Sequence, residues 1–254
     1  MLIRIYKNRN ISEGTYDTLI SKLNRMGTHH ASIHGDNEDV VYYGNNRNLY
    51  VISLADGVSA CSAAKQGASI AGREITNLFL KKGSHFLEYE AEQIADFALS
   101  HILYELKAHA RSAARPVEDY SSTVASVLID KKKQKMLCFN LGDNMILAAG
   151  NGKCRVLSMP ADSSRGCCVT TTRHAEQKIS VSLCGTGSMD SVVICSDGAW
   201  REMFLKNRLR PEVARMLADN DYAALENFLA GRNCFDDYSF ISLDMRGNGR
   251  RKNT

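Results

Sequence analysis

Residues 51–60 read VISLADGVSA, an apolar run that ends in Asp56 and Gly57. The run has the length and composition of a buried strand. The same pattern returns at residues 192–198, VVICSDG, where a second apolar run ends in Asp197 and Gly198. One Asp-Gly pair at a strand end is ordinary turn chemistry, because both residues favour turn conformations. Two such endings in one chain are either a coincidence or two halves of one site.

The pattern around these runs predicts where helices and strands lie. Apolar residues at spacings of three and four predict helices over 62–82 and 88–110. Short β-type runs separated by polar or Gly-containing turns follow, at residues 122–130, 135–143, 145–150, 154–159, 178–183 and 191–197. Two more helices are expected near 199–205 and 210–230, and a last strand at 238–245. Because helices and strands come in separate runs, the order favours an α+β fold over a β-α-β alternation.

Composition bounds the organisation of the chain. It has 254 residues, 44% of them hydrophobic, which is enough for one large core. Three prolines, no Ser/Gly-rich linker and no repeat predict a single domain over residues 1–245. Residues 246–254 form a short basic tail that we expect to be disordered. Without its four basic residues, 28 basic residues face 28 acidic ones. The basic excess therefore belongs to the tail, and no nucleic-acid partner is expected.

Targeting signals are also absent from the sequence pattern. No segment approaches the ~20 apolar residues that a membrane span needs, so no membrane partner is expected. Residues 1–10 lack the apolar h-region of a signal peptide, and a cytoplasmic location is expected. The eight cysteines show no C-x-x-C spacing, so we expect reduced, buried thiols that act as small hydrophobic residues. The pattern leaves the oligomeric state open.

Aspartates recur where apolar strands begin or stop. They are Asp39, Asp56, Asp143, Asp197, and the pair Asp236 and Asp237. If their strands share a sheet, these ends can converge, and converging carboxylates repel one another unless a cation joins them. Oxygen ligands without His or Cys favour Mg²⁺ or Mn²⁺ over Zn²⁺. Two such ions about 3.5–4 Å apart would bind a phosphate and activate a water. The residues alone do not separate a phosphomonoesterase from a nuclease.

Six motifs in order, NED, LADGVSA, SST, LGDN, ICSDGAW and FDDYSF, resemble the metal-dependent serine/threonine protein phosphatases of type 2C. The resemblance runs from about residue 30 to 244. It implies a four-layer α-β-β-α sandwich, in which two antiparallel sheets are flanked by helices and the metals lie at one end. It also implies phosphoprotein substrates and two Mn²⁺ or Mg²⁺ ions, with a third held more weakly. A water that bridges the metals would attack phosphorus in line, without a phosphoenzyme.

The resemblance implies a role for each motif residue. Asp56 would bridge both metals, and the Gly57 carbonyl would bind one of them. Asp39 would hold the waters of the second metal. The other implied metal ligands are Glu38 for the second metal, Asp197 and Asp236 for the first, and Asp143 for the third.

Two departures from the family pattern and one variable segment matter. His34 stands where the family usually has an Arg that clasps phosphate, and an imidazolium could contact phosphate without the bidentate fork of Arg. Val58 stands where many eukaryotic members have a His proposed as general acid. Residues 161–177 lie where the family has a variable flap, which we expect to shape substrate choice. Two alternatives stay open: a non-enzymatic binding or sensing module on the same fold, and a small-molecule phosphomonoesterase.

Overall fold

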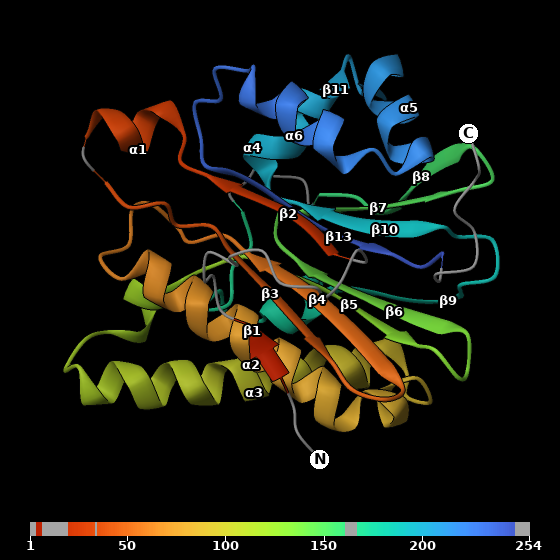
Figure 1. Ribbon diagram of the computed structural model, residues 1–254. Helices are drawn as coiled ribbons and strands as arrows, with labels where there is room; N and C mark the ends of the chain where they lie inside the picture. Colours follow the sequence, from red (N-terminus) through yellow and green to blue (C-terminus); the bar gives the residue numbers. More distant parts are fainter. Residues whose placement is uncertain (1–3, 7–19, 34, 161–166, 247–254) are drawn as a thin grey trace.

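The computed structural model describes residues 4–6, 20–33, 35–160 and 167–246, and the strands within these ranges form two large antiparallel sheets that face each other (Figure 1). The first sheet has the order β1 (Arg4–Tyr6), β3 (Val40–Asn45), β4 (Leu49–Ala55), β5 (Val124–Asp130), β6 (Lys135–Leu141) and β9 (Ser180–Gly185). The second has the order β2 (Ile20–Arg25), β13 (Tyr238–Asp244), β10 (Ser191–Cys195), β7 (Met145–Gly150) and β8 (Lys153–Ser158).

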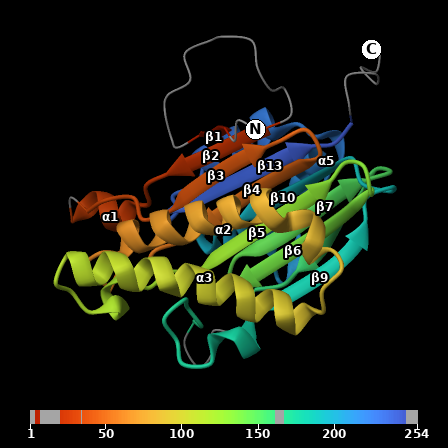
Figure 2. The ribbon, with the colours of Figure 1, turned by 90° about the horizontal axis from the view of Figure 1, so that it is seen from below.

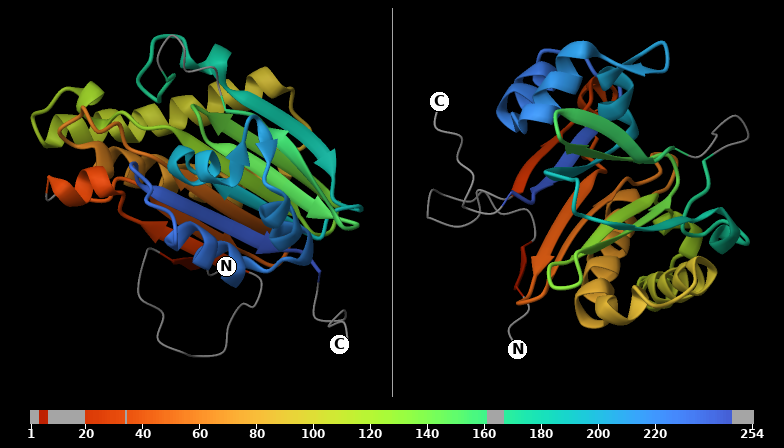
Figure 3. Two further views of the ribbon diagram at one scale, coloured as in Figure 1. Left: turned by 90° about the horizontal axis from the view of Figure 1, so that it is seen from above. Right: turned by 90° about the vertical axis from the view of Figure 1, so that its right-hand side faces the viewer.

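Helices cover the two outer faces of this pair of sheets. Seen from below, two long helices lie across the first sheet: α2 (Ala64–Phe86) and α3 (Ala91–Ser112) (Figure 2). Shorter helices pack on the second sheet: α4 (Asp197–Met203), α5 (Pro211–Asp219) and α6 (Tyr222–Ala230), which belong to the blue part of the chain above that sheet in the side view (Figure 3). Smaller elements complete the described chain: α1 (Thr28–Ser32), η1 (Val117–Tyr120), η3 (Ala175–Lys178) and the hairpin of β11 (Phe204–Leu205) and β12 (Arg208–Leu209).

Three hydrophobic layers hold the four layers of backbone together. One lies between the first sheet and α2 and α3, one between the sheets, and one between the second sheet and α4 to α6. In β4, Val51 belongs to the layer under the helices, while Ile52 and Leu54 belong to the layer between the sheets. Because both faces of β4 are buried, its sequence is a continuous apolar run instead of an alternating one. The predicted α-β-β-α sandwich is confirmed.

The structure corrects part of the predicted element list. The single helix predicted over 210–230 is wrong: the chain forms α5 and α6 instead. Asn220 ends α5 in the left-handed region, with φ 55°. Asp221 then begins α6, and its side chain accepts a hydrogen bond from the Ala224 N–H at 3.0 Å. A polar pair that tolerates turn conformations therefore breaks the helical pattern. The strands β1, β2 and β3 and the short α1 were not among the predicted elements.

Two expectations concern the whole chain. All eight cysteines are free thiols, but burial holds only for Cys138, Cys195 and Cys234, and the other five are partly exposed. Across the described ranges, no helix combines the length and apolar character needed to cross a membrane.

Candidate functional site

Strand register brings the predicted aspartates to one end of the sandwich. In the first sheet Val40 of β3 pairs with Ala55 of β4, so Asp39 and Asp56 lie next to each other just beyond the ladder. In the second sheet Cys195 of β10 lies between Met145 of β7 and Phe240 of β13. Three more aspartates therefore lie just beyond the same ends: Asp143, Asp197 and Asp236. These three, with Asp39 and Asp56, form what we call the carboxylate cluster.

Burial and neighbouring charges raise the pKa values of three members of the carboxylate cluster. The pKa of Asp56 is raised well above its ordinary value, first by burial and then by the charges of the other four members. Burial, with help from Asp237 and Asp197, raises the pKa of Asp39 to about 7. Burial, with help from Asp143 and Asp236, raises the pKa of Asp197 to about 6. The two sheets thus contribute to one electrostatic site.

Several oxygens at this site are buried without a hydrogen-bond partner. They are both carboxylate oxygens of Asp39, Oδ1 of Asp197 and Oε2 of Glu38. A buried polar atom without a partner costs roughly 1–3 kcal/mol, and more if it is charged. An all-oxygen donor set of this kind suits Mg²⁺ or Mn²⁺. Within the described residues, no three His, Cys, Asp or Glu side chains are yet grouped so that they could hold an ion, so binding would draw these carboxylates closer together.

Backbone contacts fix Asp56 in its place. The Thr123 N–H donates to the Asp56 carbonyl at 2.8 Å, and Gly57 forms a β-bridge with Ser122. A Cβ at Gly57 would lie 2.7 Å from the carbonyl oxygen of Ala64 in α2, so a side chain at this position would push the helix away. The predicted SST motif therefore supports the turn that carries Asp56.

A tight turn carries Asp143. Gly142 has φ +101°, and a Cβ there would lie 2.6 Å from the Thr123 side chain. The Asn144 side-chain amide donates to Thr123 Oγ1 at 2.9 Å, and the Trp200 indole N–H donates to the Asp143 carbonyl at 2.8 Å. Trp200 belongs to α4, so this turn joins the helix that begins at Asp197.

Asp237 is a residue whose role the sequence analysis did not identify. Its buried Oδ1 accepts the Gly27 N–H at 2.8 Å, and its Oδ2 accepts the Glu38 N–H at 2.7 Å. Oδ2 also lies 2.9 Å from Nδ1 of the buried His30, whose Nε2 is 3.7 Å from Glu38 Oε2. Burial alone would lower the pKa of His30, but the neighbouring carboxylates outweigh it and the pKa is raised. Asp237 thus joins the start of β13 to α1 and to Glu38.

A second residue that the sequence analysis did not identify lies on α4. Arg201 Nη1 is 2.8 Å from Asp197 Oδ2 and 4.0 Å from Asp236 Oδ2. The spacing of four residues from Asp197 on a predicted helix was the signal that could have found it.

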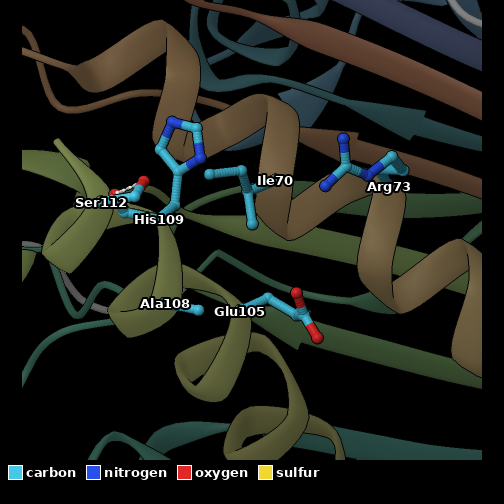
Figure 4. Close-up of a pocket in the computed structure, with 6 residues that line it drawn as sticks. All are labelled: Ile70, Arg73, Glu105, Ala108, His109 and Ser112. Carbon is cyan, nitrogen blue, oxygen red and sulfur yellow. Dashed lines mark hydrogen bonds between the residues drawn. The ribbon is translucent and has the colours of Figure 1, made fainter.

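Two hollows lie near the sandwich surface. One, of about 370 Å³, opens beside the cluster, and among its lining residues are Asp39, Asn24 and Lys65. The other, of about 250 Å³, lies between α2 and α3 and contains none of the predicted site residues (Figure 4). Of these two hollows, the one beside Asp39 adjoins the candidate site.

Two predicted site features fall partly or wholly outside the described residues. His34 lies outside them, so its predicted contact with phosphate stays a prediction. Of the predicted flap, residues 161–166 lie outside and 167–177 are described. All other predicted site residues are described and lie at the same end of the sandwich, although no three of their His, Cys, Asp or Glu side chains are grouped so that they could hold an ion.

Comparison with known proteins identifies the family. A family model described as Protein phosphatase 2C matches residues 26–230, more than half of the chain. The chain belongs to the protein phosphatase 2C family. The family assignment agrees with the six motifs and with the fold, and it makes the protein a protein phosphatase by family. A search of the curated proteins finds no significant match.

Solved structures show the same protein phosphatase 2C fold. The serine/threonine phosphatase Stp1 from Staphylococcus aureus is 16% identical with a TM-score of 0.66, over 95% of this chain and 100% of that one. The S. agalactiae serine/threonine phosphatase is 17% identical with a TM-score of 0.61, over 89% and 98%. RsbX, solved in complex with magnesium, is 12% identical with a TM-score of 0.55, over 94% and 98%.

Proposed function

We propose that this protein hydrolyses phosphoserine and phosphothreonine in proteins with the help of two divalent ions, Mn²⁺ or Mg²⁺. The observation that carries the proposal is the carboxylate cluster. Its five aspartates come from both sheets, and burial together with neighbouring charges raises the pKa values of Asp39, Asp56 and Asp197, at a cost in stability that a binding module without metals has no need to bear. The family assignment and the structures of Stp1 and RsbX support it.

Each residue of the site has a proposed part. Asp56 would join both ions, and the remaining metal ligands would be Glu38, Gly57 through its carbonyl, Asp143, Asp197 and Asp236. Asp39 would orient water at the second ion. When bound, the ions would neutralise the phosphoryl oxygens and make a water acidic enough to attack phosphorus. The unpartnered oxygens of Asp39, Asp197 and Glu38 are the atoms that fit this task.

The chain's own residues position these ligands. Asp237 and His30 hold the Glu38 segment against the start of β13. The backbone contacts of Thr123 and Gly57 hold Asp56 at the end of β4. Because these supports are hydrogen bonds and close backbone packing, they fix the backbone that carries Glu38 and Asp56, while the carboxylate side chains would move closer together when the ions bind. The leaving group would take its proton from water, since Val58 offers no acid beside Asp56.

The test is hydrolysis of an aryl phosphate with Mn²⁺, with and without a chelator, between pH 6 and 9. We expect turnover that the chelator abolishes. No metal-dependent turnover anywhere in this range would reject the enzyme and leave a binding module. A panel of phosphoserine, phosphothreonine and small-molecule phosphates then tests the substrate class. Faster turnover of the small molecules than of every phosphopeptide would reject a protein substrate.

A further inference from the structure

Arg201 differs from the other basic residues because it lies against the carboxylate cluster and is accessible. Within the described residues, the basic side chains that pair with a predicted metal ligand are His30, through Glu38, and Arg201. His30 is buried and already engaged with Asp237, whereas 50% of the Arg201 side chain is exposed. Arg201 is therefore the cation of this pair that an incoming anion can reach.

The contacts of Arg201 leave most of its donors available. Its Nη1 pairs with Asp197 Oδ2 at 2.8 Å, while Asp197 Oδ1 is buried without a partner. One carboxylate oxygen thus anchors the guanidinium, and the other stays available for a metal ion. A guanidinium carries five N–H donors in a planar fork. The donors on Nε and Nη2 make no hydrogen bond to any described residue.

Neighbouring contacts hold the guanidinium at the rim of the cluster. Its Cζ lies 5.8 Å from the centre of the Trp200 ring, and the Trp200 indole N–H is bonded to the Asp143 carbonyl at 2.8 Å. Arg201 also reaches within 4.0 Å of Asp236. Three members of the cluster, Asp143, Asp197 and Asp236, are therefore linked directly or through Trp200 to this one side chain.

We propose that Arg201 binds the phosphate of the substrate. The inference rests on the proposed function, since it requires a phosphoryl group beside Asp197 and Asp236. A phosphate dianion next to several carboxylates needs a cation in addition to those that the carboxylates hold. A guanidinium can bind phosphate through two parallel N–H···O hydrogen bonds. Because Arg201 is partly exposed and contacts Asp197 through one nitrogen, its other N–H groups can donate to a phosphate. Arg201 then keeps its contact with Asp197 and donates to the phosphate through its remaining nitrogens.

The test compares Arg201→Met and Arg201→Lys with Arg215→Met, which alters an exposed arginine on α5. Calorimetry measures the Kd of inorganic phosphate for the Mn²⁺-loaded protein, and separately the Kd of Mn²⁺ for the metal-free protein. We expect Arg201→Met to weaken phosphate binding at least about tenfold, the loss typical of a charge-assisted hydrogen bond. Arg201→Lys should recover part of the lost phosphate affinity, because Lys keeps the positive charge but lacks the bidentate donors of Arg. The Mn²⁺ Kd should stay the same or fall, and Arg215→Met should change neither.

Two results would overturn the inference. An unchanged phosphate Kd in Arg201→Met removes Arg201 from phosphate binding. A Mn²⁺ Kd weakened tenfold, with normal phosphate binding once Mn²⁺ saturates, would make Arg201 a residue that only positions Asp197. Circular dichroism checks that both variants fold, because Asp197 is buried and loses its cation in Arg201→Met, whereas Arg201→Lys keeps the charge. Phosphate binding that depends on Arg201 without any turnover would reject the proposed enzyme and keep the inference.

Discussion

Replacing Asp56 with Asn should make the metal-free protein more stable. The substitution keeps the shape of the side chain and removes one charge that faces the other four members of the carboxylate cluster. The charges of these four members raise the pKa of Asp56 after burial, which is the largest cause. Each pKa unit corresponds to about 1.4 kcal/mol, so the relief of about one unit of repulsion would stabilise the protein by about that amount. Because burial and not repulsion is the largest cause of the raised pKa, we expect the free energy of unfolding to increase by roughly 1–2 kcal/mol.

The gain depends on pH in a predictable direction. The folded pKa values of Asp39 and Asp197 lie above their ordinary value of 3.8, so the folded protein binds more protons than the unfolded one. Their favourable contribution is fully present below pH 3.8 and is lost as the pH rises through about 6 and 7. The benefit of Asp56→Asn should therefore be largest near pH 8 and small near pH 5.

Thermal unfolding in a chelator, followed by circular dichroism, measures this effect. For a chain of this size about 1 kcal/mol shifts Tm by roughly 2–4 °C, so Tm should rise by about 2–8 °C at pH 8. Asp96→Asn, an exposed carboxylate on α3, is the matched control and should change Tm little. A Tm for Asp56→Asn equal to or below that of the unaltered protein at pH 8 would refute the idea that these carboxylates repel one another.

Three further predictions follow from the same contacts. His30→Ala should lower the free energy of unfolding, measured in urea, by roughly 3–5 kcal/mol, because it leaves the buried Asp237 carboxylate with one partner fewer. A decrease below about 1 kcal/mol would contradict a stabilising contact between His30 and Asp237. Gly67→Ala should lower the free energy of unfolding by roughly 1–3 kcal/mol, because the new Cβ would lie 2.1 Å from a carbonyl oxygen of η1. Gly187→Ala is the control and should lower it far less, because no atom lies within 4 Å of the new Cβ. Mn²⁺ should raise the Tm of the metal-free protein more at pH 8 than at pH 5, and an equal rise at both would count against carboxylate ligands.

The parts of the fold that the sequence predicted are those with strong local patterns. The buried strand before Asp56 and the one before Asp197 were visible because both faces are covered, which makes each a continuous apolar run. The end of α5 at Asn220 was not predicted, because apolar residues continue at helical spacing on both sides of Asn220. The strand β2 also escaped prediction: it is half-exposed and reads as a mixed polar segment, ISKLNR.

The candidate site likewise has residues that the motifs predict and contacts that only the fold creates. The aspartates could be listed from motifs, but their convergence depends on the pairing of Val40 with Ala55 and on the facing of two sheets. Asp237 acts on Gly27 and on Glu38, each about 200 residues away in the chain, so no local pattern marks it. The Arg201 contact, in contrast, is local, because a spacing of four residues on α4 brings Arg201 and Asp197 to the same face of the helix.

The most direct test of the metal-dependent site is a crystal grown with Mn²⁺ and measured at a wavelength where manganese scatters anomalously. The account predicts anomalous peaks between Asp56 and Asp197, with Asp236 on the same ion and carboxylate oxygens of these residues as ligands. Crystals of Asp56→Asn grown in the same way should lose the peaks while the fold is kept. A well-ordered structure at saturating Mn²⁺ with no peak among these aspartates would contradict the central claim.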